Sequence, residues 1–304
     1  MQLPDLLVRP LAERDVDRAG DVDFVAFQEV ALRHGAASSV TTPADCRSYV
    51  RHLLALDPTG GLVAEIGGEV VGMAWVHCRG PVATIGPVAV DPPFQHRGVG
   101  RRLVERCLAL VRPRVAQVRL VQESFNAASL GLYLRLGFRV VCPLLEVELP
   151  AGSTVRPLEP PPPVAIRPSE PRDRRQLIDA DARMFGAPRP QNVAVYLERG
   201  EALVAERAGA LAGFAFAIGF RRRGYVGSAA ADDGEVLLAL LSTVSSRLAG
   251  RGLAVRMLCS ATDRALVDGV LTLGFRVAKA CQLMAWGGGT APPPNYVLMN
   301  GDML

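Results

Sequence analysis

The stretch TIGPVAVDPPFQHRGVG, from Thr84 to Gly100, decides how the rest of the chain is interpreted. Its run of strand-forming residues stops at a DPP sequence, and a glycine-rich turn then leads into helical spacing from Arg101 to Val111. The pattern predicts a strand, a tight loop and the start of a helix. The first N–H groups of a helix have no partner within it, and the helix dipole favours negative charge there. The stretch therefore predicts a site for a phosphate group.

The loop itself supplies the candidate anion-binding residues. Glycine at two positions lets an anion approach the backbone, and three arginines supply positive charge. The spacing of QHRGVG is one residue short of G-x-G-x-x-G and lacks the Lys-Ser/Thr pair of a P-loop, so neither a dinucleotide fold nor an NTPase is supported. The candidates are Gln95, His96, Arg97, Gly98, Val99, Gly100, Arg101 and Arg102.

A second block of sequence follows the loop. The run from Gln117 to Gln122 predicts a strand, and NAASLGLYLRLGF then extends from Asn126 to Phe138. Together the two blocks resemble the GNAT superfamily of acyl-CoA-dependent N-acyltransferases, in which Q/R-x-x-G-x-G/A precedes N-x-x-A/S-x-x-x-Y-x-x-x-G-F. The resemblance covers residues 1–150. The residues that match the two motifs in order are Gln95, Arg97, Gly98, Gly100, Asn126, Ser129, Tyr133, Gly137 and Phe138.

This resemblance implies an α/β (α+β) fold with a mixed central sheet flanked by helices, and acetyl-CoA as cosubstrate without a metal. The phosphate loop, Asn126 and Ser129 would bind acetyl-CoA. Backbone atoms of Val88 and Val90 would pair with its pantetheine amides like an extra strand, and the Val90 N–H would stabilise the oxyanion. Tyr133 would act as the general acid that protonates the departing thiolate.

The base that deprotonates the acceptor amine stays open at this stage. The strand TIGPVAV, which would line the acyl group, contains no acidic residue. Glu65, His77 and Glu123 are the candidates, and an imidazole is attractive because it titrates near neutral pH.

Composition sets the broad class of the protein. A chain of 304 residues fits two domains of about 150. No run of 18 apolar residues exists and Asp5 lies where a signal peptide would be apolar, so we expect a cytoplasmic protein without a membrane partner.

Six cysteines without a C-x-x-C pair indicate reduced core residues, not a metal site. Lys279 is the only lysine among the 34 lysine and arginine residues. This imbalance indicates a bias in the coding sequence and does not indicate binding of nucleic acid.

A proline-rich segment divides the chain, and the order of motifs then begins again. Thr154 to Pro163 predicts a semi-rigid linker, which gives a catalytic domain at 1–150, a linker at 151–163 and a second domain at 164–304. The repeated segments are Val8-Arg9-Pro10 and Ile166-Arg167-Pro168 at an offset of 158, Leu62 to Glu65 and Leu203 to Glu206 at 141, and Leu136 to Val140 and Leu273 to Val277 at 137. The chain therefore predicts two tandem GNAT domains.

The second copy lacks parts of the predicted site. The offset falls by four residues, and the simplest place for this loss is the phosphate loop, where Asp91 to Gly100 is replaced by Asp232 to Leu237. At the 137 offset, Val270 takes the place of Tyr133. Asp263 takes the place of Asn126, so a carboxylate would face an anionic cosubstrate. We therefore expect only the first copy to bind acyl-CoA, and the second to be a degenerate domain.

Two functions from different classes remain. The leading one is an N-acetyltransferase acting on a primary amine of a small molecule or peptide; the alternative is a non-catalytic acyl-CoA-binding regulatory or structural module. The intact Tyr133 favours the enzyme, and the missing acid on the cosubstrate strand favours the module. The duplicated fold is compatible with a monomer that has pseudo-dimeric tandem domains or with a homodimer.

Overall fold

The computed structural model describes residues 5–36, 38–220 and 223–298, and contacts divide the chain into two compact units. The first unit is Met1–Arg139 with Met284–Gly289, and the second is Val140–Leu283 with Thr290–Leu304. Relative to the boundaries predicted from the sequence, the strand that follows Gly137 therefore packs in the second unit, and a short segment near the C-terminus packs in the first.

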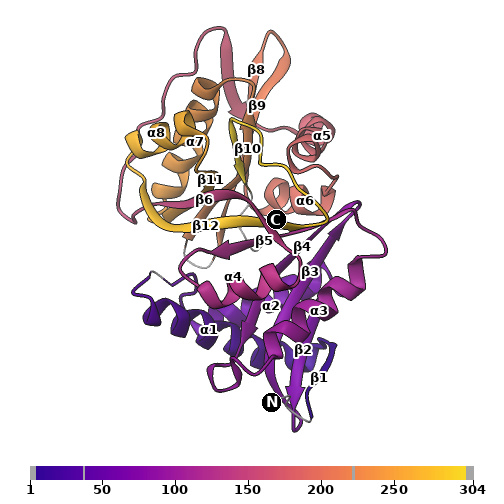
Figure 1. Cartoon of the computed structure of the whole chain (residues 1–304). Helices are drawn as coiled ribbons and strands as arrows, with labels where there is room; N and C mark the ends of the chain where they lie inside the picture. The colour runs from indigo at the N-terminus through magenta and orange to yellow at the C-terminus, as the bar shows by residue number, and fades with distance from the viewer. Residues whose placement is uncertain (1–4, 37, 221–222, 299–304) are drawn as a thin grey trace. The chain divides into compact units, whose positions relative to one another are not determined.

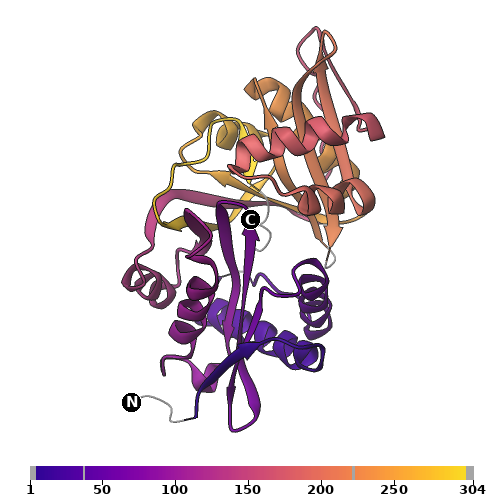
Figure 2. The same ribbon diagram turned by 90° about the vertical axis from the view of Figure 1, so that its right-hand side faces the viewer.

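The first unit has a mixed sheet in the order β1-β2-β3-β4-β5, antiparallel except for the parallel pair β4 and β5. Figure 2 shows α1 and α2, in indigo, on one face of this sheet and α3 on the other. The elements are β1 (Leu7–Pro10), α1 (Val16–Arg33), α2 (Pro43–Leu56), β2 (Gly61–Ile66), β3 (Glu69–Arg79), β4 (Val82–Val90), α3 (Val99–Val111), β5 (Gln117–Glu123) and α4 (Ala127–Arg135), with 3-10 turns at Glu13–Asp15 and Pro92–Phe94.

Local sequence signals explain where several of these elements begin. Thr42 caps α2 by accepting a hydrogen bond from the Asp45 N–H at 3.1 Å, and Pro43 occupies the first helical position, where no N–H is needed. Gly67 and Gly68 adopt positive φ angles of 58° and 86° in the turn between β2 and β3. The apolar residues of α3 recur at helical spacing and are buried against the sheet: Val99, Leu103, Val104, Cys107, Leu108 and Val111.

The second unit repeats this plan. Figure 1 shows α5 and α6 on one side of its strands and α7 and α8 on the other. The elements are β6 (Arg139–Leu149), β7 (Val164–Pro168), a 3-10 turn (Pro171–Asp173), α5 (Arg174–Phe185), α6 (Pro190–Arg199), β8 (Glu201–Arg207), β9 (Ala210–Phe220), β10 (Arg223–Ala231), α7 (Gly234–Ala249), β11 (Ala254–Ser260), α8 (Arg264–Thr272), β12 (Arg276–Trp286) and β13 (Tyr296–Leu298). The last residues of β12, from Met284, belong to the first unit.

β6 is held in the second unit by backbone pairing and by charge. It runs antiparallel to β11, from Leu144 opposite Ser260 to Leu149 opposite Val255. Arg256 of β11 is 4% exposed and donates hydrogen bonds to Glu146 and Glu148 of β6. Because a buried guanidinium needs carboxylate partners, these contacts fix β6 at this position.

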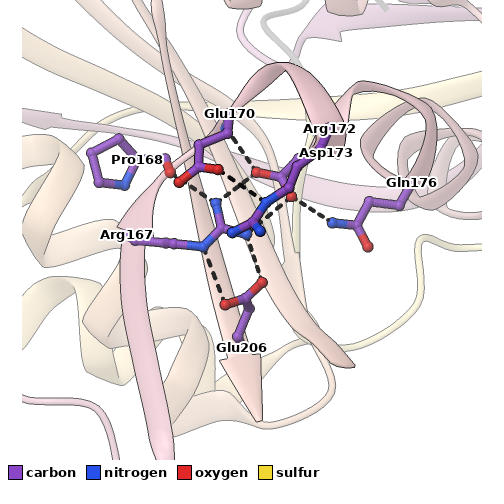
Figure 3. A network of polar contacts seen from close by, with 7 residues as sticks. All are labelled: Arg167, Pro168, Glu170, Arg172, Asp173, Gln176 and Glu206. Atoms are coloured by element: carbon purple, nitrogen blue, oxygen red, sulfur yellow. Dashed lines mark hydrogen bonds and ion pairs between the residues drawn. The ribbon is translucent and has the colours of Figure 1, made fainter. Parts of the chain in front are cut away.

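The same ion network recurs in both copies. In the first, Arg9 donates to Asp15 at 2.6 Å and to Glu65 at 2.8 Å. In the second, drawn in Figure 3, Arg167 donates to Asp173 at 2.6 Å and to Glu206. Each arginine joins the first strand of its copy to the following 3-10 turn and to the second strand, so the network is part of the repeated scaffold.

Candidate active site

The two parallel strands of the first unit separate along their length. β4 and β5 pair only from Val82 to Thr84, opposite Gln117 to Arg119. Every residue of both strands is described, and none of the later residues of β4 pairs with β5. This leaves a gap between the strands that begins at Thr84.

Backbone N–H groups of β4 point into that gap. The Asp91 N–H donates to the Val71 carbonyl of β3 at 2.9 Å, on the opposite edge of β4. Because successive N–H groups of a strand point to alternate edges, the N–H groups of Val90 and Val88 face the gap. These are the two positions that the sequence analysis selected on β4.

The helix after β4 starts without a side-chain cap. Gly98 is the residue before α3, with φ at +91°, and it makes no side-chain hydrogen bond to the helix. A Cβ atom there would meet no neighbour within 4 Å, so glycine is required by the backbone conformation and not by lack of space. The N–H groups at the start of α3 are therefore open to an anion.

The predicted loop residues lie around this helix start. Gln95 donates its amide N–H to the Val90 carbonyl at 3.0 Å and thus ties the loop to the end of β4. Arg97 is exposed, and Arg101 and Arg102 are exposed beside Glu105. Val99 is 1% exposed in the core, so it offers only its backbone. His96 has φ at 59°, and Gly100 has room for a Cβ, 3.6 Å from Val90.

Tyr133 lies on α4, which follows β5. Its side chain is 9% exposed and packs edge-on against Phe138, with ring centroids 5.8 Å apart. Burial raises the pKa of Tyr133 above its ordinary value, and the nearby groups of Cys107 and Glu123 raise it further. The hydroxyl therefore keeps its proton at neutral pH.

Asn126 and Ser129 build the start of α4. Asn126 is the N-cap and accepts a hydrogen bond from the Ser129 N–H at 3.1 Å, while the Ser129 hydroxyl donates to the Asn126 carbonyl at 3.0 Å. Sequence reasoning missed Gln122, whose amide donates to the Asn126 carbonyl at 2.9 Å and to the Ser129 hydroxyl at 3.1 Å. Gln122 is 2% exposed in the structure. The signal in the sequence was a polar residue at a strand position where an apolar one is expected.

The three candidate bases occupy different environments. Glu65 is bound to Arg9. Its counterpart Glu206 is bound to Arg167 in the second copy, which has Val270 at the position of Tyr133, so this contact serves the scaffold. Glu123, at the end of β5, accepts a hydrogen bond from Ser39 at 2.9 Å.

His77 lies in a buried ion cluster. It is 3% exposed, and its Nδ1 atom is hydrogen-bonded to the Asp57 carboxylate. Arg79 donates to the same carboxylate at 2.9 and 2.6 Å. Burial alone would raise the pKa of Asp57, but hydrogen bonds from His77 and Arg79 hold it below its ordinary value. Asp57 is therefore charged at neutral pH.

Comparison with known proteins agrees with this architecture. Residues 32–138 match the family described as the acetyltransferase (GNAT) family, and residues 177–298 match an acetyltransferase (GNAT) domain. An uncharacterized N-acetyltransferase from Archaeoglobus fulgidus is 32% identical over 124 residues, which are 38% of this chain and 84% of that protein. The chain belongs to the GNAT family. It contains two GNAT domains in tandem.

A second relative by sequence matches less of its own length, and a solved structure matches nearly all of its own. A mycothiol acetyltransferase from Thermobispora bispora is 39% identical over 90 residues, 27% of this chain and 30% of that protein. The chain thus spans less than a third of the length of that relative. A putative acetyltransferase from Pyrococcus horikoshii, solved by crystallography, has the same fold, with a TM-score of 0.78 at 20% identity over 99% of this chain and 97% of that one.

In the second GNAT domain, the position that corresponds to the β4–β5 gap is filled by a strand of that same domain. β10 and β11 pair in parallel only from Arg223 to Tyr225, and β13 then lies between them. Val297 of β13 pairs with Ala229 on one side and Cys259 on the other. The space that corresponds to the gap between β4 and β5 is therefore occupied by the chain itself.

The helix start and the tyrosine position also differ in this domain. Only residues 232 and 233 separate β10 from α7, where residues 91–98 separate β4 from α3. Asp233 caps α7 by accepting from the Glu235 N–H at 2.7 Å. Asp263 is the N-cap of α8 and also accepts from the Asn295 N–H at 2.8 Å, next to β13. Val270 is fully buried.

Two further observations concern the described part of the chain. No group of three or more histidine, cysteine or carboxylate side chains within it is arranged to hold a metal ion. None of its helices is both long and apolar enough to cross a membrane.

Proposed function

We propose that the chain is an acyl-CoA-dependent N-acyltransferase that moves an acetyl group from acetyl-CoA to a primary amine of a small molecule or peptide. The observation that carries the proposal is the coincidence, within the first unit, of an open strand gap, an uncapped helix start and Tyr133. The second unit has the same fold and lacks all three.

The residues present fit acetyl-CoA. A pantetheine arm has amide groups that pair with a strand edge, and the N–H groups of Val88 and Val90 lie on the edge that faces the gap. A diphosphate suits the open N–H groups at the start of α3, with Arg97, Arg101 and Arg102 exposed beside it. His96, Val99 and Gly100 contribute backbone to the same loop, and Leu132 of α4 lies 3.7 Å from the position of a Cβ atom on Gly100. Asn126 and Ser129, at the start of α4, complete the proposed set of cosubstrate contacts.

The chemistry requires two tasks of these residues. Bound acetyl-CoA supplies an acyl group activated as a thioester. The Val90 N–H donates to the carbonyl oxygen where negative charge develops during attack by the amine. Tyr133 gives its proton to the departing sulfur, and its raised pKa keeps that proton available at neutral pH.

The first experiment is a calorimetric titration of the intact chain with acetyl-CoA. We expect one molecule bound per chain, because β13 fills the second gap. Replacement of Gly98 by valine should weaken binding at least about tenfold, since a β-branched residue is strained at positive φ. Two bound molecules, or none, would contradict the proposal.

The second experiment measures release of the CoA thiol with a panel of alkyl amines, amino sugars and peptides with free α-amines. Amine-dependent thiol release supports an enzyme. Tight binding of acetyl-CoA without thiol release by any amine would favour the non-catalytic module instead.

A further inference from the structure

The Nε2 atom of His77 is buried and has no hydrogen-bond partner in the described part of the chain. An unsatisfied buried polar atom destabilises the fold, so it calls for a partner such as a water or a ligand. The other ring nitrogen, Nδ1, is engaged by the Asp57 carboxylate. A carboxylate accepts hydrogen bonds only, so Nδ1 carries a proton, and in the neutral ring Nε2 then presents a lone pair.

The surroundings of Asp57 keep this arrangement in place. Arg79 is 2% exposed and holds both carboxylate oxygens of Asp57. Asp57 follows α2, whereas His77 and Arg79 lie on the same face of β3, two residues apart. The charged carboxylate of Asp57, held by Arg79, therefore orients the ring of His77 through its Nδ1 atom.

His77 lies where the strand gap begins. It is the direct neighbour of Thr84 across the β3–β4 pair, and Thr84 is the last residue of β4 that pairs with β5. Directly opposite residues of an antiparallel pair project from the same face of the sheet. Val76 and Ile85, the adjacent residues, pack in the core beneath α3, so His77 lies on the face that α1 and α2 cover (Figure 2).

The second domain has lost this cluster together with the tyrosine. β9 corresponds to β3 residue by residue at an offset of 141, which places Ile218 at the position of His77 and Phe220 at that of Arg79. The Arg9 network, by contrast, is retained in both copies. The Asp57 cluster is thus specific to the copy that has the open gap.

We propose that His77 is the general base that takes the proton of the acceptor amine through waters that lead from Nε2 to the amine, with Asp57 as its positioning residue. The inference rests on the proposed function. The ammonium proton passes to Nε2 and from there to solvent, and the free amine nitrogen bonds to the thioester carbon. The carbon–sulfur bond breaks as Tyr133 protonates the sulfur, and the second nitrogen proton returns through solvent to the tyrosine oxygen. The net products are an amide, the CoA thiol and one proton.

The test compares two probe amines with acetyl-CoA. n-Butylamine, like a lysine side chain, has a pKa of about 10 and is protonated at pH 7. Methoxyamine is uncharged at that pH and needs no base before it attacks. The variant His77→Asn retains an amide N–H at the position of Nδ1, to bind Asp57, but has no basic nitrogen.

We expect His77→Asn to lower kcat/KM for n-butylamine by about 10²-fold or more and for methoxyamine by less than about tenfold. Asp57→Asn should shift the ratio of the two rates in the same direction, because the amide favours the wrong tautomer. Glu65→Gln is the matched control: it should leave the ratio unchanged, since Glu65 serves the scaffold.

Equal losses for both amines, or no loss for n-butylamine, would overturn the role of His77 and leave the proposed function intact. Absence of thiol release by the unaltered protein with these two amines and with every amine of the panel would overturn both proposals. His77→Gln provides a second variant if His77→Asn does not fold, and calorimetric binding of acetyl-CoA to each variant verifies that the first unit is folded.

Discussion

The two GNAT domains of this chain differ most at the strand gap and at the helix that follows it. In the first, β4 and β5 diverge and no described strand lies between them, and α3 starts at an uncapped glycine. In the second, β13 lies between β10 and β11, and Asp233 caps α7. The unpaired strand edges and the uncapped helix start of one copy are thus matched in the other by groups of the chain itself. The comparison teaches that a fold can keep its scaffold after its binding groups have been replaced by internal contacts.

The largest effect should come from the buried ion pair of the second domain. Arg189 and Asp181 are fully buried, with a hydrogen bond of 2.7 Å, and Ser228 donates to Asp181 at 2.7 Å. Replacement of Asp181 by asparagine leaves the guanidinium without a countercharge, which should cost about 3–5 kcal/mol. Urea denaturation measures this loss, and a loss below about 1 kcal/mol would mean that the pair is not needed to hold the second domain together.

A catalytic effect of nearly the same size is expected for Tyr133→Phe. Loss of the general acid should slow CoA-thiol release about 10²-fold, with acetyl-CoA affinity changed by less than about twofold. Because burial raises the pKa of Tyr133, the unaltered protein should show no alkaline loss of this acid up to about pH 10. The matched variant Val270→Tyr should gain no activity, since β13 fills the adjacent gap.

A smaller effect, equal in the two domains, should follow from loss of the repeated arginine. Arg9→Ala and Arg167→Ala each remove hydrogen bonds to two carboxylates and should cost about 1–3 kcal/mol. Unequal losses in denaturation experiments would show that the scaffold is not equivalent in the two copies.

Acid should weaken the same network. Arg167 lowers the pKa of Asp173 to about 2, from an ordinary value of 3.8. A lowered pKa stabilises the fold above the ordinary value, and this contribution is lost as the pH falls from about 4 towards 2. Asp173→Asn should therefore be less stable than the unaltered chain at neutral pH and should lose less stability over that interval.

The smallest effect concerns the exposed charge at the start of α3. Arg101→Ala should weaken acetyl-CoA binding about two- to fivefold at low salt and less at high salt, because exposed charges are screened. Arg264→Ala, on the exposed surface of α8, is the control and should leave binding unchanged. Equal effects of the two substitutions would remove the helix start from the binding site.

Much of the first domain could be predicted because its signals are local. The DPP stop, the left-handed Gly98 and the apolar spacing of α3 all act within a few residues, and the helix begins at Val99, two residues before the predicted start of helical spacing at Arg101. The tandem GNAT architecture followed from the offsets between repeated segments and is confirmed by the two family matches.

The features that escaped prediction depend on contacts distant in sequence. β13 has only three residues, and its position between β10 and β11 depends on partners far earlier in the chain. Asp57 was not predicted as a site residue, because nothing in the neighbouring sequence indicates that His77 and Arg79 bind it. The assignment of β6 to the second unit likewise follows from pairing with β11, which local patterns do not encode.

The insertion of β13 has a consequence for biosynthesis. A ribosome synthesises β10 and β11 before Tyr296–Leu298, so until β13 is in place the two strands expose edges with unpaired amides and carbonyls. Such edges recruit any extended peptide nearby. Expression of the chain cut before residue 296 should therefore yield aggregates rather than a second vacant pocket, and a synthetic peptide spanning 290–298, supplied in trans, should restore solubility.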